Sequence, residues 1–282
     1  MRLFNKVAIV GVGLVGGSIA LAIKNKGLAK EVIGVSRHKK TLLLAKRMGA
    51  IDKGALDLNI IRDADLVILA TPVSAITKLA AKISKIVKKE CLITDVGSTK
   101  QAIVSELERI FPNYVGSHPL AGSEKRGILN ADPRILKDSL CIFTPTGNTN
   151  KAAQEKIARF WSMLGARVVY LTSGVHDRIL SFVSHLPHLV AFSLIDTVPS
   201  SYLKFASAGL KDTTRVAASD SEIWSDIFLS NKNNILESID IFQANLSKIK
   251  SAIQKKDKEQ LISIFKLAKR KRESLNCLMF KV

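Results

Sequence analysis

The sequence predicts an α/β domain with a doubly wound parallel sheet, followed by an all-α helical domain. A glycine-rich turn joins an apolar strand to a helix at the start of the chain, and short β-branched runs then alternate with helical patterns as far as Leu171. From Gly174 onward there is almost no strand signal. Alternating strands and helices are typical of parallel sheets with helices on both faces. We therefore expect two domains, residues 1–172 and 173–282.

The first element is an apolar strand at residues 7–10, followed by a glycine turn and a helix at 18–26. In such a unit the first glycine allows a tight turn, the second lets the backbone approach a pyrophosphate, and the third lets the helix pack closely. Unpaired N–H groups at the helix N-terminus then favour the diphosphate. A purely structural glycine turn is the alternative. The spacing favours a Rossmann-type dinucleotide-binding domain, with the cofactor at Gly11, Gly13, Leu14, Val15 and Gly16.

The remaining elements follow from the period of the apolar residues. The expected strands are residues 31–36, 66–70, 92–95, 114–117, 140–144 and 168–171, and the expected helices are 41–48, 74–87, 100–110 and 151–164. In the second domain, residues 179–197 read as one long apolar helix, and residues 223–253 repeat Ile, Leu and Phe at helical spacing. Helices that are apolar on more than one side bury against each other and against a second subunit. We expect a homodimer through this domain.

Composition narrows the class of protein. The chain has 282 residues, of which 47% are hydrophobic, and its three cysteines are scattered, so neither a disulfide framework nor a metal cluster is expected. We find no apolar run of the ~18 residues that a membrane span requires and no signal-peptide pattern. The expected location is the cytoplasm, with no membrane partner.

The net charge of +19 raises the question of a nucleic-acid partner. The excess is spread over expected helix faces, such as Lys78, Lys82 and Lys85, without the interleaved aromatic residues that single-strand binders use. A solvated lysine-rich surface is therefore expected, and no nucleic acid. An anionic substrate and cofactor would also benefit from the positive field.

The end of the second strand bears on the choice of cofactor. An acidic residue that binds the adenosine ribose is expected there, but Ser36 stands at this position and Arg37 follows. A serine and several cations suit a 2′-phosphate, so we expect NADP in preference to NAD. The alternative is that Arg37 stacks on adenine and Ser36 serves NAD. Thr71 and Pro72, after the strand at 66–70, are also expected at the cofactor.

Two loops at the carboxyl edge of the sheet carry candidate chemistry. The segment 95–100 (DVGSTK) follows the fourth strand and the segment 116–124 (GSHPLAGSE) follows the fifth, so both should face the nicotinamide. In the helical part, polar residues gather at 176–177 (HD), 184–188 (SHLPH), 209–215 (GLKDTTR) and Trp224. Each of these has a structural explanation when taken alone, such as a capping ion pair or a satisfied histidine in a turn.

Taken together, the strings GSHPLAGSE, HDRILSFVSHLPH and GLKDTTRVAASDSEIW resemble the prephenate dehydrogenase family, which includes arogenate and cyclohexadienyl dehydrogenases. The resemblance covers nearly the whole chain and implies a Rossmann domain followed by a helical dimerisation domain. It suggests the monofunctional form, without a fused chorismate mutase or regulatory module. The implied reaction oxidises the ring hydroxyl of a cyclohexadiene, a small dicarboxylate, while a ring carboxylate leaves as CO2. Hydride passes to a nicotinamide cofactor.

The resemblance also implies roles for single residues. His118 is expected to accept the proton of the 4-hydroxyl, a role that suits an imidazole with a pKa near neutrality. Ser98 is expected to orient the same hydroxyl, because a serine can donate and accept at once. Arg215 is expected to bind a substrate carboxylate through its planar fork.

Further positions line the implied pocket. His188 is expected near the substrate side chain, where donation to a ketone slightly favours prephenate over arogenate, and His185 near the cofactor. Glu124 and Asp212 resemble acidic residues that gate access through ion pairs with Arg126 or Arg215. Ser123 belongs to the same substrate loop. Trp224 either completes the pocket of a partner subunit or is a core indole.

Two other classes of protein share some of these features. Another Rossmann dehydrogenase with a helical second domain would use a catalytic lysine on the first long helix of that domain, where this chain has His185 and His188. The net charge of +19 would also suit a nonenzymatic nucleotide-binding or nucleic-acid-binding protein. Such a protein would have no use for His118, Ser98 and Arg215 together. The choices between prephenate and arogenate and between NADP and NAD, and inhibition by tyrosine, stay open at this point.

Overall fold

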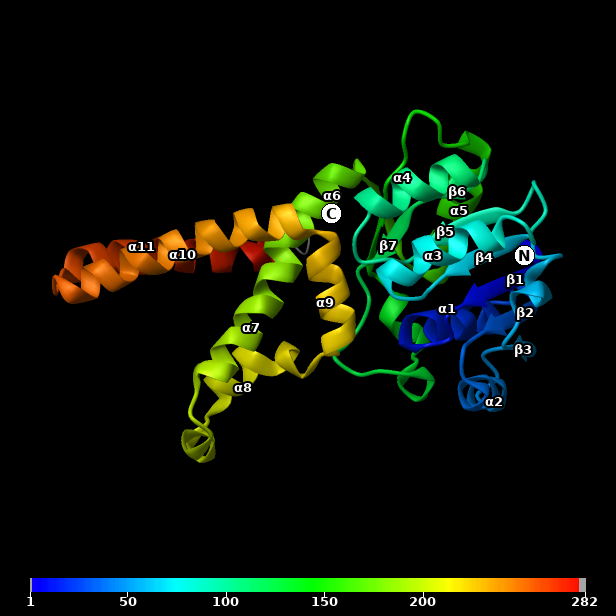
Figure 1. The fold of residues 1–282 in the computed structure, drawn as a ribbon. Helices are drawn as coiled ribbons and strands as arrows, with labels where there is room; N and C mark the ends of the chain where they lie inside the picture. Colours follow the sequence, from blue (N-terminus) through cyan, green and yellow to red (C-terminus); the bar gives the residue numbers. More distant parts are fainter. Residues whose placement is uncertain (1, 279–282) are drawn as a thin grey trace. The chain divides into compact units, whose positions relative to one another are not determined.

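The computed structural model describes residues 2–278 and divides the chain into two compact units, Met1–Lys232 and Asn233–Val282. The first unit contains a six-stranded sheet of order β3-β2-β1-β4-β5-β6, in which every pair is parallel (Figure 1). This is the strand order of a doubly wound dinucleotide-binding domain, as predicted. The strands are β1 (Phe4–Val10), β2 (Ala29–Val35), β3 (Lys53–Ala55), β4 (Leu66–Leu69), β5 (Leu92–Asp95) and β6 (Tyr114–Val115).

Helices cover both faces of this sheet. Alternate residues of β1 point to opposite faces, so that Val7 and Ile9 join one apolar cluster while Ala8 and Val10 join the other. The first cluster includes residues of α1 (Leu14–Asn25), α2 (Lys39–Arg47) and α5 (Lys151–Leu164). The second includes residues of α3 (Val73–Ile83) and α4 (Gln101–Ile110). The core therefore consists of two layers, one on each side of the sheet.

A second, three-stranded sheet departs from the single parallel sheet expected from the sequence. It has the order β7-β8-β9, formed by Ser117–Pro119, Leu140–Phe143 and Arg167–Tyr170, and β7 runs antiparallel to β8. The strand expected at 114–117 is thus divided at Gly116 between two sheets. Strand β3 was not expected, because its three residues, KGA, carry no apolar pattern. In this part of the chain, 3₁₀ turns lie at Leu58–Ile61, Ile128–Asn130 and Pro133–Leu136.

After Tyr170 the described residues form only helices and turns, as predicted. The first of these is one continuous helix, Ser173–Thr197, made of α6 (Ser173–Leu180), a π-helical turn at Ser181–His185 and α7 (Leu186–Thr197). Pro187 has no N–H to continue the regular hydrogen-bond ladder, which accounts for the wider turn before it.

This helix corrects one expectation. By length and composition Ser173–Thr197 could cross a membrane, although no such segment was expected. The helix qualifies by its mean hydropathy, because polar residues such as Ser184, His185 and His188 interrupt the apolar run itself. Its His176, Asp177 and His185 are nevertheless buried and hydrogen-bonded inside the first unit.

The rest of the first unit packs around α7 and α3. A 3₁₀ turn at Ser200–Phe205 leads to α8 (Ala208–Thr214), a second 3₁₀ turn at Arg215–Ala218 and α9 (Ser221–Ser230). Helix α8 and the Arg215–Ala218 turn pack against α7, and α9 packs against α3. The helical pattern expected over residues 223–253 is in fact divided at Asn231 between α9 and the next helix.

The second unit is formed by α10 (Lys232–Gln254) and α11 (Lys258–Leu278), which lie side by side in Figure 1. Lys256 adopts a positive φ of 54° in the turn between them, and Asp257 accepts the N–H of Gln260 at 2.9 Å to begin α11. The predicted domain boundary after residue 172 falls within the first unit and stays a prediction.

Candidate active site

In sheets of this strand order the cofactor binds in a crevice outside the carboxyl ends of the strands, at the point where the order reverses, here between β1 and β4. Gly11 has φ +101°, and a Cβ there would lie 2.4 Å from the carbonyl oxygen of Ala70 after β4. A Cβ on Gly16 would lie 2.1 Å from the Gly11 carbonyl oxygen. Both positions therefore require glycine, the first for its conformation and the second for close packing of α1.

The residues of this crevice fit a dinucleotide. Gly13, the N-cap of α1, has open space where a side chain would be, and among residues 2–278 no side chain caps the helix. Its first-turn N–H groups are thus left for an anion, beside the half-buried Leu14 and Val15. Thr71, followed by the exposed Pro72, has a buried Oγ1 with no hydrogen-bond partner among the described residues. Because an unpaired buried hydroxyl is costly, a polar cofactor atom here would relieve it.

Ser36 and Arg37, the residues expected to contact the adenosine ribose, directly follow β2. Ser36 follows the last strand residue, and its Oγ accepts the backbone N–H of His38 at 3.2 Å. The Arg37 side chain is exposed beside it. This edge therefore presents a hydroxyl and a guanidinium where a ribose-binding carboxylate would otherwise lie.

A buried polar cluster ties the Ser98 loop to the strand that carries His118. Asp95 and Lys100 form a fully buried ion pair, and Lys100 Nζ also donates to the Ser117 carbonyl oxygen at 2.9 Å. The second oxygen of Asp95 accepts the Tyr114 hydroxyl at 2.8 Å. Ser98 itself is half-buried, and within the described part of the chain its hydroxyl makes no hydrogen bond. It is left available to a ligand.

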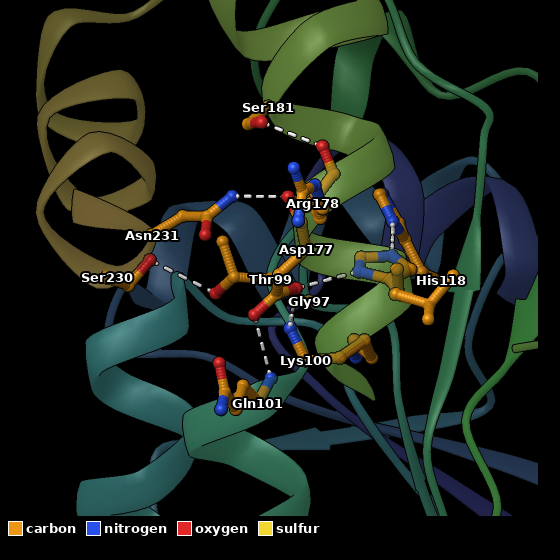
Figure 2. Close-up of polar contacts among 12 residues, drawn as sticks. Gly97, Thr99, Lys100, Gln101, His118, Asp177, Arg178, Ser181, Ser230 and Asn231 are labelled. Atoms are coloured by element: carbon orange, nitrogen blue, oxygen red, sulfur yellow. Dashed lines mark hydrogen bonds and ion pairs between the residues drawn. The ribbon is translucent and has the colours of Figure 1, made fainter. Parts of the chain in front are cut away.

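His118 lies on β7 and is buried, with 8% of its surface exposed. Its Nδ1 is 2.8 Å from His176 Nε2, and His176 Nδ1 is 2.7 Å from Asp177 Oδ1. Asp177 also accepts the backbone N–H groups of Lys100 at 2.7 Å and Gln101 at 2.9 Å, at the first turn of α4 (Figure 2). One carboxylate of α6 therefore holds both a histidine pair and the helix that follows the Ser98 loop.

The environment of His118 changes one expectation. Burial lowers its pKa well below the ordinary value of 6.5, and the nearby His176, Lys100 and His185 lower the pKa further. The pKa near neutrality expected from its role is therefore wrong for the free protein. The imidazole is neutral at physiological pH, which is the protonation state that a proton acceptor needs.

His185, His188 and Trp224 form a second group on the helical side. His185 is buried, its Nδ1 lies 3.2 Å from Asn231 Nδ2, and burial lowers its pKa to about 4. The half-buried ring of His188 stacks on Trp224 of the same chain, with ring centroids 3.6 Å apart and planes at 21°. Trp224 thus has a packing partner in its own subunit.

The hydrogen bond of His188 corrects the argument for prephenate. His188 Nδ1 is 2.9 Å from the Ser184 carbonyl oxygen, which can only accept, so Nδ1 carries the proton. Burial lowers the pKa of His188, and the charge of Arg215 lowers it further. The neutral ring therefore offers Nε2 as an acceptor. In this state His188 has no proton on Nε2 and cannot donate a hydrogen bond from that atom to a ketone, contrary to the expectation from the sequence.

The loop after β7 is joined to the helical part by two ion pairs. Arg215 donates to Glu124 at 2.7 Å, and Arg126 pairs with Asp220, the N-cap of α9. The pKa of Glu124 lies below its usual value, because the Glu124 carboxylate accepts a hydrogen bond from its own backbone N–H and lies near the charge of Arg215. Ser123 is exposed and accepts the Lys125 N–H at 3.2 Å. Asp212 is exposed and has no ion pair within the described residues, so its gating role stays a prediction.

Acidification should destabilise this fold through its buried histidines. The pKa values of His118, His176 and His185 are lowered in the folded state, so below the ordinary value of 6.5 the unfolded chain binds more protons than the folded one. The free energy of unfolding therefore falls as the pH drops below about 6.5 and is fully retained above it. Thermal denaturation at about pH 5 and about pH 7.5 should show a lower Tm at the acidic pH. An unchanged Tm would contradict the burial of these rings.

Several residues to which the sequence patterns assigned no role make contacts that build this site. His176 and Asp177 were noticed only as a polar pair, and Lys100 and Asp95 only as members of a loop segment. The signal that could have marked them is a histidine next to an aspartate one turn into a helix capped by Thr172. Their partners lie far away in sequence, so no local pattern identifies them.

Comparison with known proteins agrees with this geometry. Residues 19–170 match the family model described as prephenate dehydrogenase, nucleotide-binding domain, and residues 172–267 match prephenate dehydrogenase, dimerization domain. The chain belongs to the prephenate dehydrogenase family. It is an oxidoreductase of that family, with a nucleotide-binding domain of the NAD(P) type and the family's dimerisation domain.

Relatives are similar over nearly the whole chain. A prephenate dehydrogenase of Bacillus subtilis is 35% identical over 95% of this chain and 76% of its own length. A cyclohexadienyl dehydrogenase of Zymomonas mobilis is also 35% identical, over 98% of this chain and 97% of its own. The crystal structure of prephenate dehydrogenase from A. aeolicus with hydroxyphenyl propionate and NAD+ superimposes with a TM-score of 0.92, at 34% identity, covering 96% and 98% of the two chains.

Proposed function

We propose that the protein catalyses the NADP-dependent oxidative decarboxylation of prephenate or arogenate. The observation that carries the proposal is the buried, neutral His118 at the carboxyl edge of the sheet, on a strand tied to the Ser98 loop. β5, which precedes that loop, pairs with β4 beside the cofactor crevice. A hydroxyl group held at this edge would meet a proton acceptor and a hydride acceptor together.

The residues supply what the reaction demands. His118 accepts the proton of the ring hydroxyl, Ser98 orients that hydroxyl, and Arg215 binds a substrate carboxylate. Gly11, Gly13 and Thr71 would hold NAD(P)+, which would supply the hydride acceptor when bound. The ring carboxylate leaves as CO2, and its bonding electrons complete the aromatic ring. In this proposal His185 serves the cofactor, and His188 with Trp224 lines the part of the pocket that takes the substrate's side chain.

The preference for NADP rests on Ser36 and Arg37. A guanidinium and a hydroxyl suit a 2′-phosphate, and no carboxylate stands at this position to repel it. Replacing Arg37 with Gln should lower kcat/KM for NADP+ about 10- to 100-fold, since a charge-assisted hydrogen bond contributes about 1.5–3 kcal/mol. The same variant should change kcat/KM for NAD+ by less than about threefold. Equal losses with both cofactors would show that Arg37 contacts a part common to them, such as adenine.

His188 discriminates between the two candidate substrates, whose side chains carry a keto group or an ammonium group. Its neutral Nε2 can accept a hydrogen bond from the ammonium group of arogenate, whereas a keto group offers no proton to it. We therefore expect turnover of arogenate as well as prephenate. Initial rates with each substrate at a saturating level of cofactor test this expectation. Turnover of prephenate alone would show that His188 does not contact the amino position.

The helical part supports the proposal of a homodimer. Apolar side chains of the first unit that are exposed in a single chain include Leu203, Phe205 and Leu229, the last two at 77% and 76%. They lie within the residues that match the family's dimerisation domain. Light scattering at micromolar concentration should give the mass of a dimer. A monomer mass would contradict the proposal.

A further inference from the structure

We propose that His176 and Asp177 are positioning residues, which hold His118 in the tautomer whose Nε2 is free to accept the substrate proton. The proposal rests on the proposed function, because it assumes that His118 is the proton acceptor. It begins from three side chains in line, with Asp177 Oδ1 2.7 Å from His176 Nδ1 and His176 Nε2 2.8 Å from His118 Nδ1. None of these contacts involves an atom that a substrate would need.

The direction of each hydrogen bond follows from its acceptors. The Asp177 carboxylate receives two backbone N–H groups, from Lys100 and Gln101, and an ionised carboxylate can only accept. His176 must therefore donate from Nδ1. A neutral His176 then presents the lone pair of Nε2, so His118 must donate from its own Nδ1. The remaining nitrogen of His118, Nε2, carries no proton, and within the described residues it has no hydrogen-bond partner.

The opposite arrangement is disfavoured by the same contacts. With the proton on Nε2 of His176, the lone pair of its Nδ1 would face the Asp177 carboxylate at 2.7 Å. A doubly protonated His176 would place a cation in a buried site near Lys100, and burial lowers the pKa of His176. Either state would force the Nε2 position of His118 to carry the proton. His118 could then accept nothing from a substrate.

The network also has a place in the reaction. When the proton of the ring hydroxyl moves to His118 Nε2, the Nδ1–H of His118 stays hydrogen-bonded to His176. The positive charge on His118 then lies next to the His176 imidazole, which the Asp177 carboxylate already polarises. No proton needs to pass along the chain. The arrangement is analogous to the aspartate of a serine hydrolase triad, which fixes a histidine tautomer without taking its proton.

The backbone holds the network rigidly. Asp177 caps α4 directly after the Ser98 loop, and Asn231 Nδ2 donates to the Asp177 carbonyl oxygen at 2.7 Å (Figure 2). The carboxylate thus sets the position of Ser98 and, through His176, the tautomer of His118. Replacing Asp177 would disturb both at once. Replacing His176 leaves the cap intact and separates the two effects.

The test uses a matched pair of substitutions at His176. His176→Phe keeps a ring but removes the acceptor for His118 Nδ1, so the Nε2-protonated tautomer of His118 becomes populated. His176→Gln puts an amide oxygen near the former Nε2 position, where it can accept the same N–H. We expect kcat of His176→Phe to fall at least ~10-fold with KM changed by less than about threefold, and His176→Gln to recover most of the loss.

The readout that a merely structural role would not move is the tautomer itself. Nitrogen NMR of histidine-labelled protein, without substrate, should show His118 Nε2 unprotonated in the wild type and in His176→Gln, and protonated in His176→Phe. The signal is assigned by its loss in His118→Asn. A protonated Nε2 in the wild type, or a His176→Phe variant with wild-type kcat, would overturn the proposal. If the wild type turns over neither prephenate nor arogenate, the proposed function fails while the NMR result still decides the tautomer.

Discussion

Replacing His118 with Asn is expected to lower kcat about 100-fold or more while leaving KM within about threefold of the wild type. The asparagine amide can take the place of Nδ1 and keep the hydrogen bond to His176 Nε2, which is 2.8 Å long in the wild type. It has no group in the place of Nε2, so the proton acceptor is lost while the local structure is kept. Steady-state rates with prephenate and arogenate measure both constants.

The pH dependence of the wild type provides the control for this variant. Because burial, His176, Lys100 and His185 all lower the pKa of His118, kcat/KM should stay constant as the pH falls to about 6.5 and decline only below it. The residual activity of His118→Asn should lack this acidic decline. Wild-type turnover in His118→Asn would remove His118 from the mechanism. An acidic limb at or above the ordinary histidine pKa would contradict its buried, neutral state.

Replacing Arg215 with Ala is expected to raise KM for the substrate about 10- to 100-fold and to change kcat by less than about threefold. The carboxylate that Arg215 binds is present in the ground state and in the transition state alike, so its loss weakens both equally. A hydrogen-bonded charge pair contributes about 1.5–3 kcal/mol, which sets the size of the effect. Arg215→Lys should recover little, because an ammonium group lacks the planar fork.

Two control variants separate substrate binding from the ion pair with Glu124. Glu124→Gln breaks the 2.7 Å pair but keeps the guanidinium, so it should not reproduce the rise in KM. Arg134→Ala removes an exposed arginine whose partner, Asp132, lies outside the site, and it should leave both constants unchanged. A KM for Arg215→Ala equal to that of the wild type would make Arg215 a structural residue only.

The sequence predicts the dinucleotide-binding half well because its signals are local. Four apolar residues, a glycine turn and a helix follow one another without interruption, and each glycine has a steric reason that short-range geometry supplies. The division of residues 114–119 between two sheets was not predictable in the same way. It depends on pairing of His118 with Ile142, which are distant in the chain.

The site shows the same limit. His118, Ser98 and Arg215 were identified by their motifs, but the contacts that set their chemistry join residues far apart in sequence. His118 and His176 are 58 positions apart, and Arg215 and Glu124 are 91 positions apart. The proton of His188 could not be placed until its carbonyl partner was known. Burial likewise determines the pKa of His118, and burial is a property of the folded chain.

The most direct test of the account is the initial rate of nicotinamide reduction by the purified wild-type protein with prephenate and with arogenate, each with NADP+ and NAD+. We expect substrate-dependent reduction with release of CO2, a phenolic product, and a higher kcat/KM for NADP+ than for NAD+. Absence of reduction with both substrates and both cofactors would contradict the proposed function. Reduction with a clear preference for NAD+ would leave the reaction in place and contradict the role given to Ser36 and Arg37.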